Sequence, residues 1–278
     1  MPFEFTKMHG LGNDFIVINA LDDPFDLSGR QIAALAHRRK GVGFDQILIV
    51  EPPGNSGADF TYRIFNADGG EVENCGNGAR CFARYVRDKG LTDKQDIAVS
   101  TACGLMHLSV IDESQVLVRM GVPEFEPSKV PFVADQIESS YELAVGSELL
   151  TFGVVSLGNP HAVTWVNDVE QVDVEHFGPL IENHERFPSR VNAGFAQLLN
   201  RSEIRLRVFE RGVGETMACG TGACAAAIVG IVQGALDREV KVKVHLTGGE
   251  LQVRWSDNNA QVEMIGPSAT VFEGRLEL

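Results

Sequence analysis

Hydrophobic and polar positions alternate along much of this chain, a pattern typical of strands that pack one face on a core. In the first half, strand-like alternation or β-branched runs occupy residues 14–19, 46–50, 60–65, 97–101, 105–111 and 115–120. In the second half, such runs occupy residues 141–145, 150–157, 161–166, 203–209, 240–246, 250–254 and 261–265. Each half is therefore predicted to form a sheet that is mainly antiparallel.

Helical patterns are fewer, and they are expected at 29–39, 76–88, 174–184 and 220–234. The first has Ser28 as a candidate N-cap and Gly41 as a candidate stop. The helices at 76–88 and 220–234 are rich in small and apolar residues, so each is expected to be the central buried helix of its half. Many strands with few helices predict an α+β fold in each half.

The chain also contains an internal repeat. The segment "RIFNADGGEVENCGNGA" (63–79) aligns without a gap, at an offset of 144, with "RVFERGVGETMACGTGA" (207–223), and eight of 17 positions are identical. The identities are Arg63/Arg207, Phe65/Phe209, Gly70/Gly214, Glu71/Glu215, Cys75/Cys219, Gly76/Gly220, Gly78/Gly222 and Ala79/Ala223. A repeat of this kind predicts two similar domains, each with one Cys-Gly-x-Gly turn at the start of a helix.

Two weaker matches support the repeat. "LGNDFIVI" (11–18) resembles "LGNPHAVTWV" (157–166) at an offset of 146, and "GFDQILIV" (43–50) is paired with "GFAQLL" (194–199) at an offset of 151. In the alignments of the two halves, Asn66 corresponds to Glu210 and Phe15 corresponds to His161. The two halves therefore differ in the polar side chains at matching positions. The Pro-rich stretch 121–132 marks the expected boundary.

Composition narrows the class of protein. The 278 residues carry a formal charge of −14, which makes nucleic acid a poor partner. No apolar run of 18 residues and no signal-peptide pattern occurs, so neither a membrane span nor secretion is expected, and the default location is the cytoplasm. Five cysteines without zinc-finger spacing argue against a disulfide framework and against a metal site.

A cysteine in front of a Gly-x-Gly turn at a helix start has a clear chemical use. The free N–H groups and the positive end of the helix dipole favour a carboxylate, and they are expected to lower the pKa of the cysteine. If both helix ends point into one cleft, one thiolate can remove a proton while the opposite thiol delivers one. Two acid/base groups on opposite faces of a carbon are what a racemase or epimerase needs. Two helix N-termini aimed at the substrate carboxylate would also stabilise the carbanion, so pyridoxal phosphate is not required.

Simpler interpretations exist for the cysteines. A free cysteine is commonly a small buried core residue, and Cys81 and Cys224, inside the helices, are interpreted in this way. Cys103 has no counterpart in the other half and is interpreted as structural. The repeated motif is what favours chemistry at Cys75 and Cys219.

The segments "HGLGNDF", "ENCGNGARC", "LGNPHAV", "ERGVGETMACGTGA" and "GPSATVFEG" resemble the signature segments of the diaminopimelate epimerases, from residue 9 to residue 274. The resemblance implies a pyridoxal-independent, two-base epimerase without cofactor or metal. Its substrate would be 2,6-diaminopimelate, interconverted between the LL and meso forms for lysine and peptidoglycan synthesis. It also implies a homodimer of chains with two pseudo-symmetric domains, residues 1–119 plus 264–278 and residues 120–263, with the active site in the cleft between them.

Residue roles follow from the same resemblance. Cys75 and Cys219 match the acid/base pair, and His161 and Glu210 match residues that assist their proton transfers. Arg211 is expected on the distal carboxylate, because a guanidinium binds a carboxylate in bidentate fashion. The remaining expected substrate contacts are Asn13, Gln46, Asn66, Gly76, Asn77, Asn159, Asn192, Glu210, Gly220 and Thr221.

Three other functions stay open at this point. A proline or hydroxyproline racemase would share the cysteine pair without needing Asn66, Glu210 and Arg211 to hold a second amino acid head. A thiol-disulfide switch would use the two cysteines as a redox pair. A carboxylate-binding module without catalysis would explain the helix ends but not the paired cysteines.

Overall fold

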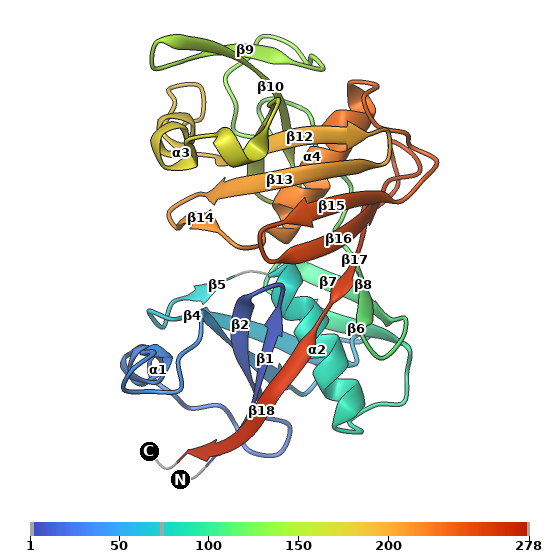
Figure 1. Cartoon of the computed structure of the whole chain (residues 1–278). Helices are drawn as coiled ribbons and strands as arrows, with labels where there is room; N and C mark the ends of the chain where they lie inside the picture. Colours follow the sequence, from blue (N-terminus) through green and yellow to red (C-terminus); the bar gives the residue numbers. More distant parts are fainter. Residues whose placement is uncertain (1–2, 73–74, 277–278) are drawn as a thin grey trace. The chain divides into compact units, whose positions relative to one another are not determined.

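The computed structural model describes residues 3–72 and 75–276 and divides into two compact units. Unit 1 comprises Met1–Arg119 and Ile265–Leu278, and unit 2 comprises Met120–Met264 (Figure 1). Glu73 and Asn74, which belong to the first cysteine motif, lie outside the described residues. Each unit has its own helices and its own run of paired strands.

Unit 1 is a mostly antiparallel sheet with two helices. Its strands pair in the order β18–β1–β2–β3–β4–β6–β7–β8, with parallel pairing at β2–β3 and β4–β6, and β5 pairs with β4. The elements are β1 (Phe3–Gly10), β2 (Asn13–Asn19), α1 (Gly29–Ala36), β3 (Gln46–Glu51), β4 (Phe60–Asn66), β5 (Glu71–Val72), α2 (Gly76–Asp88), β6 (Asp96–Thr101), β7 (Gly104–Val110), β8 (Gln115–Arg119) and β18 (Ala269–Leu276).

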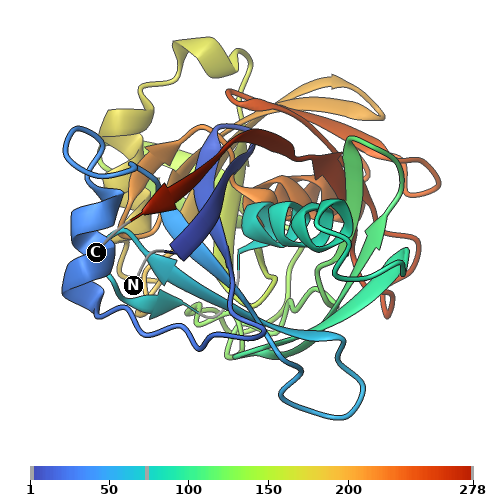
Figure 2. The same ribbon diagram turned by 90° about the horizontal axis from the view of Figure 1, so that it is seen from below.

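The central strands of unit 1 are covered on both faces. Ile16 and Ile18 of β2 join the core under α1, together with Ile32 of that helix. Phe15, one position away and therefore on the opposite face, lies next to the start of α2. The helix α2 contacts β1, β2, β3, β7 and β8, as can be followed in Figure 2. Because the central strands are buried on both faces, their sequences are continuous apolar runs.

Unit 2 repeats this plan. Its strands pair in the order β9–β10–β11–β12–β13–β15–β16, with parallel pairing at β11–β12 and β13–β15, and β14 pairs with β13. The elements are β9 (Tyr141–Val145), β10 (Glu148–Ser156), β11 (Pro160–Trp165), the 3₁₀ turn η1 (Val169–Gln171), α3 (Val174–Glu182), β12 (Asn192–Asn200), β13 (Glu203–Glu210), β14 (Gly214–Thr216), α4 (Gly220–Val232), β15 (Val242–Leu246), β16 (Gly249–Arg254) and β17 (Glu263–Pro267), which crosses the unit boundary.

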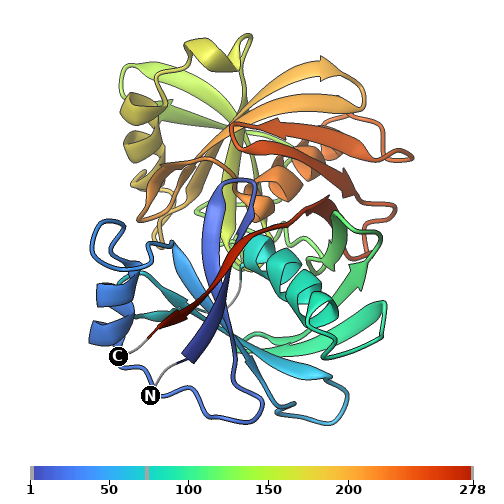
Figure 3. The same cartoon turned by 60° about the horizontal axis from the view of Figure 1, so that its bottom comes forward.

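The helix α4 is the buried helix of unit 2. It contacts β10 to β13, β15 and β16, as can be followed in Figure 3. Most of its residues are buried. The absence of a side chain at Gly153 lets β10 approach this helix closely, since a Cβ added there would lie 2.3 Å from Val229. The prediction of a central buried helix in each half is confirmed for α2 and α4.

Strand pairing corrects one of the repeat matches. In unit 1 Phe15 pairs with Gln46 across parallel strands, and in unit 2 His161 pairs with Asn192 in the same way. Gln46 therefore corresponds to Asn192, at an offset of 146. The match of 43–50 with 194–199 at an offset of 151 was wrong, because similar apolar letters in a strand fit several registers.

Several element boundaries also differ from the predictions. The helix α2 has the predicted bounds, but α3 and α4 each end two residues early, at Glu182 and Val232. Ser28 caps α1 as expected, whereas the helix ends at Ala36 and not near Gly41, because His37 is extended. The strands β1, β5, β12, β14 and β18 were not predicted, since they are short or interrupted by polar and small residues.

Candidate functional site

Each of the two cysteines is the N-cap of the buried helix of its unit. Cys75 precedes α2 with extended backbone, and its Sγ accepts a hydrogen bond from Gly78 N at 3.4 Å. Cys219 precedes α4 in the same conformation, and its Sγ accepts from Gly222 N at 3.4 Å. The thiol group takes the place that a serine or aspartate side chain usually fills at a cap. Both sulfur atoms therefore stand at the positive end of a helix.

The second glycine of the first turn is required for packing. A Cβ on Gly78 would lie 2.4 Å from the hydroxyl of Tyr62 and 3.1 Å from Leu48. Tyr62 in turn donates its hydroxyl hydrogen bond to Cys75 O at 3.3 Å. The absence of a side chain at Gly78 thus lets the start of α2 pack on the sheet.

Gly78→Ala is expected to lower the free energy of unfolding by about 1–3 kcal/mol, because this overlap outweighs the better helix propensity of alanine, which is about 1 kcal/mol. Urea unfolding measures the change. The same substitution in a Tyr62→Phe background removes the hydroxyl that is overlapped, so the additional loss there is expected to be smaller. Equal losses in both backgrounds would contradict this account of the turn.

The sequence-predicted residues of unit 1 form two groups. Asn13 Oδ1 lies 3.7 Å from Cys75 Sγ and 3.3 Å from Asn77 Nδ2, so these three side chains meet at the start of α2. Gln46 and Asn66 pair across β3 and β4, with Gln46 Nε2 donating to Asn66 Oδ1 at 2.8 Å. Gln46 Oε1 is buried without a hydrogen-bond partner among the described residues.

In unit 2 a chain of hydrogen bonds leads to Cys219. His161 Nε2 lies 3.1 Å from Asn159 Oδ1, and Asn159 Nδ2 donates to Thr221 Oγ1 at 3.3 Å. Thr221 Oγ1 in turn lies 3.5 Å from Cys219 Sγ. Because Asn159 donates to Thr221, the Thr221 hydroxyl hydrogen is left to point to the sulfur.

The two charged residues of unit 2 that were predicted as site residues, Glu210 and Arg211, lie at the end of β13 and in the turn that follows it. Thr216 Oγ1 donates to Glu210 Oε1 at 2.5 Å, and the Cys219 thiol is hydrogen-bonded to the Glu210 side chain. Arg211 N donates to Asn192 Oδ1 at 2.9 Å, and its exposed guanidinium donates to Ser189 O at 3.0 Å. The backbone of this turn is therefore fixed by Asn192, while the Glu210 and Arg211 side chains point to different partners.

The sequence reasoning missed the supporting residues of both groups, namely Asp45, Tyr62, Arg80, Glu182 and Thr216. Glu182 is buried and accepts from Gly212 N at 2.8 Å, which holds the turn that carries Arg211. Thr216 stands inside the repeated motif and could have been noticed there. Arg80 contacts Asn77 within the first turns of α2, whereas Asp45, Tyr62 and Glu182 act through contacts between separate segments, which no local pattern shows.

Comparison with known proteins decides the family. The family model described as "Diaminopimelate epimerase" matches residues 5–126 and 153–271. Two curated proteins of the same name, from Laribacter hongkongensis and Nitrosomonas eutropha, are each 55% identical to this chain. Each alignment covers the full length of both sequences. The chain belongs to the diaminopimelate epimerase family. It is accordingly an isomerase of lysine biosynthesis.

The epimerase fold is shared by more distant proteins. A solved structure of a hydroxyproline epimerase from Agrobacterium vitis superimposes with a TM-score of 0.71 at 15% identity, covering 99% of this chain and 92% of that one. The predicted α+β, diaminopimelate epimerase-like fold is confirmed. Full-length identity to diaminopimelate epimerases decides against the proline or hydroxyproline racemase that the sequence left open.

No group of three or more His, Cys, Asp or Glu side chains among residues 3–72 and 75–276 is arranged to hold a metal ion. Within the same ranges, no helix has the length and apolar character needed to cross a membrane.

The acidity of Cys219 differs from the sequence prediction. Burial raises the pKa of this thiol well above its ordinary value, and the neighbouring Glu210 carboxylate raises it further. Hydrogen bonds from Thr221 and Gly222 act in the opposite direction but are smaller. The expected lowering of the Cys219 pKa was therefore wrong, because removing the sulfur from water outweighs the helix end.

The Glu210 carboxyl is shifted in a related way. Burial raises its pKa above the ordinary value of 4.5, while hydrogen bonds from Thr216 and Cys219 lower it. Because both pKa values are raised, both groups are shifted towards their protonated forms. The Glu210 carboxyl is the neighbouring group with which the Cys219 thiol can exchange a proton.

His161 is neutral in the folded epimerase. It is 1% exposed, and burial lowers its pKa from 6.5 to about 3, with a smaller contribution from the positive charge of Arg211. The folded pKa lies below the unfolded one, so this group's contribution to stability is fully present above pH 6.5 and is lost as the pH falls towards 3.

Between pH 7 and pH 5 the folded protein is expected to lose about 2 kcal/mol through His161, because only the unfolded chain takes up the proton. Urea unfolding of wild type and His161→Gln at the two pH values measures this. The wild type should lose more stability than the variant by that amount. Equal losses would show that His161 is not buried as a neutral ring.

Proposed function

We propose that this epimerase inverts one α-carbon of 2,6-diaminopimelate with Cys75 and Cys219 as the two acid/base groups, so that the LL and meso forms interconvert. The observation that carries the proposal is the repeated cap, in which a cysteine sulfur stands at the N-terminus of each buried helix. One thiolate removes the α-proton from one face of the carbon, and the other thiol delivers a proton to the opposite face. The proton count balances, because one sulfur gains the proton that the other loses.

Unit 2 supplies the group that would generate a thiolate. The Cys219 thiol is hydrogen-bonded to Glu210, so its proton can move to the carboxylate and leave the sulfur as base. Because Cys219 is 4% exposed, the thiolate would form in a site with little water, where it is a stronger base. The Thr221 hydroxyl stabilises the negative sulfur.

The reacting carboxylate is assigned to the helix starts. Backbone N–H groups at the first turn of a helix lack partners within the helix and attract anions. Gly76 and Asn77 in α2, and Gly220 and Thr221 in α4, supply such groups in our proposal. Holding the carboxylate there stabilises the negative charge that develops when the α-proton leaves.

The amino and carboxylate groups at the unreactive end of diaminopimelate would be held by residues that do not take part in proton transfer. The Arg211 guanidinium is exposed and suits the distal carboxylate. Gln46 Oε1, buried without a partner among the described residues, suits an ammonium group, with Asn66 beside it. Asn159, Asn192 and Asn13 complete the expected polar contacts, and His161 is proposed to assist proton transfer.

A homodimer is a further part of the proposal. Val271 and Phe272 of β18 are 56% and 46% exposed, which is high for apolar side chains. Light scattering after size exclusion is expected to give the mass of two chains. A monomer that is fully active would contradict this assignment.

The substrate is tested with purified, reduced enzyme and three amino acids in parallel. LL-diaminopimelate, L-lysine and L-proline are incubated without added pyridoxal phosphate, and stereoisomers are separated by chiral chromatography. Formation of meso-diaminopimelate, with lysine and proline unchanged, is the expected result. Inversion of lysine would show that the second amino acid head is not needed, and no inversion of diaminopimelate would overturn the proposal.

A further inference from the structure

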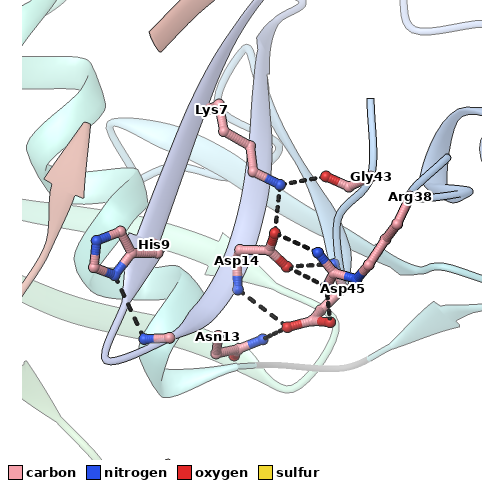
Figure 4. Close-up of polar contacts among 8 residues, drawn as sticks. Lys7, His9, Asn13, Asp14, Arg38, Gly43 and Asp45 are labelled. Atoms are coloured by element: carbon pink, nitrogen blue, oxygen red, sulfur yellow. Dashed lines mark hydrogen bonds and ion pairs between the residues drawn. The ribbon is translucent and has the colours of Figure 1, made fainter. Parts of the chain in front are cut away.

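Asn13 stands between a candidate catalytic thiol and a cluster of charged side chains. Its Oδ1 faces Cys75 Sγ at 3.7 Å. Its Nδ2 donates to Asp45 Oδ2 at 2.9 Å, a contact drawn in Figure 4. The two ends of an amide have opposite hydrogen-bonding character, since oxygen only accepts and nitrogen only donates. Which end faces the thiol therefore decides whether Cys75 is offered an acceptor or a donor.

Asp45 settles that orientation on physical grounds. An ionised carboxylate can only accept, so the end of Asn13 that faces Asp45 must be the amide nitrogen. The carboxylate oxygen Oδ2 also accepts from Asp14 N at 3.1 Å. As a consequence the carbonyl oxygen of Asn13 is turned towards Cys75 and offers it an acceptor.

The positive charge of Arg80 favours the same orientation of the Asn13 amide from the other side. Arg80 is fully buried, and its Nη2 donates to Asn77 Oδ1 at 2.9 Å. Because a guanidinium only donates, the amide nitrogen of Asn77 is left to face Asn13 Oδ1, at 3.3 Å. The hydrogen bonds thus run in one direction, from Arg80 through Asn77 and Asn13 to Asp45.

Asp45 is itself held by ion pairs. Arg38 Nη2 donates to Asp45 Oδ1 at 2.7 Å and to Asp14 Oδ1 at 2.7 Å (Figure 4). Lys7 donates to Asp14 Oδ2 at 2.5 Å from a nearly buried position. Arg38 and Lys7 hold the pKa of Asp14 at about 2, so this part of the cluster stays ionised. The cluster therefore forms a charged and ordered support behind Asn13.

We propose that Asp45 is a positioning residue that turns the Asn13 carbonyl oxygen towards Cys75 and so holds Cys75 as a hydrogen-donating thiol, ready to deliver a proton. The inference rests on the proposed role of Cys75. Asp45 contacts neither sulfur nor substrate in this account, and it acts through Asn13 alone.

The test uses the nearly isosteric variant Asp45→Asn, with Asp14→Asn as the matched control. An asparagine at 45 can present an N–H group to Asn13, whose Nδ2 then loses its carboxylate acceptor, so that the Asn13 carbonyl oxygen is held towards the sulfur less firmly. Asp14→Asn disturbs the same ion pairs but leaves Asp45 as the partner of Asn13. We expect kcat of Asp45→Asn to fall by about tenfold while KM stays within about twofold of wild type, and a smaller fall in the control.

A spectroscopic measurement separates orientation from general damage. The infrared S–H stretching band of Cys75, assigned by difference against Cys75→Ala, is expected at the lowered frequency of a thiol that donates to a carbonyl. The band should move to higher frequency or weaken in Asp45→Asn and stay in place in Asp14→Asn. An unmoved band in Asp45→Asn, or an equal change in Asp14→Asn, would overturn the proposal.

Two further results keep the test decisive. If Asp45→Asn does not fold, Asn13→Ala is compared with wild type, and a Cys75 band that does not move shows that Asn13 is not the acceptor. The infrared readout does not depend on turnover, so it separates this inference from the proposed function. An active Cys75→Ala would instead contradict the role of Cys75 in the reaction.

Discussion

Cys75→Ala and Cys219→Ala are each expected to lower kcat for epimerisation by about a thousandfold or more, because each removes one of the two proton-transfer groups of our proposal. With one sulfur missing, a proton can be removed from one face but not delivered to the other. Formation of meso-diaminopimelate from the LL isomer, followed by chiral chromatography, measures the loss.

Cys103→Ala is the control for these variants. Cys103 is exposed in the turn between β6 and β7 and belongs to neither cysteine motif, so its removal is expected to leave kcat unchanged. A folded Cys75→Ala or Cys219→Ala with more than about a tenth of wild-type activity would contradict the two-base account.

Glu210→Gln is expected to lower kcat by about a hundredfold, because the amide cannot take the proton of the Cys219 thiol. The raised pKa of Glu210 also predicts how activity depends on pH. Activity should fall as the pH drops through that pKa, since a protonated Glu210 no longer accepts a proton. This acidic limb should be absent from the residual activity of Glu210→Gln.

Thr216→Val tests the same pair without removing the carboxyl. The Thr216 hydroxyl donates to Glu210 and lowers its pKa, so the variant should shift the acidic limb to higher pH. The pH profiles of kcat for wild type, Glu210→Gln and Thr216→Val show whether the acidic limb belongs to Glu210. An acidic limb that keeps its position in all three enzymes would show that it does not belong to Glu210.

Local signals explain why much of the fold could be predicted. The start of α2 is marked by Cys75 and its glycines, and the predicted bounds of that helix agree with the structure. The repeat at an offset of 144 pointed to equivalent turns, and the same N-cap geometry occurs at Cys219. Short strands such as β5 and β14 were missed because two or three residues carry no measurable periodicity.

The pKa of Cys219 and the end of α1 could not be predicted, because both depend on the tertiary surroundings of these residues. The helix end suggested an acidic thiol at Cys219, but the depth of burial and the nearness of Glu210 depend on how α4 packs and on the turn after β13. In the same way α1 ends early where Arg38 leaves the helix for Asp14 and Asp45. These effects arise between segments that are distant in sequence, so no local pattern could have predicted them.

The most direct test of the two-base account is the distribution of deuterium early in the reaction in D2O. Reduced enzyme converts a small fraction of LL-diaminopimelate, and both isomers are then isolated and examined by mass spectrometry. Two cysteines predict deuterium at the inverted centre of the meso product and almost none in the recovered LL substrate. Deuterium appearing equally in both isomers, or undeuterated product formed by internal return of the same proton, would contradict two separate acid/base groups.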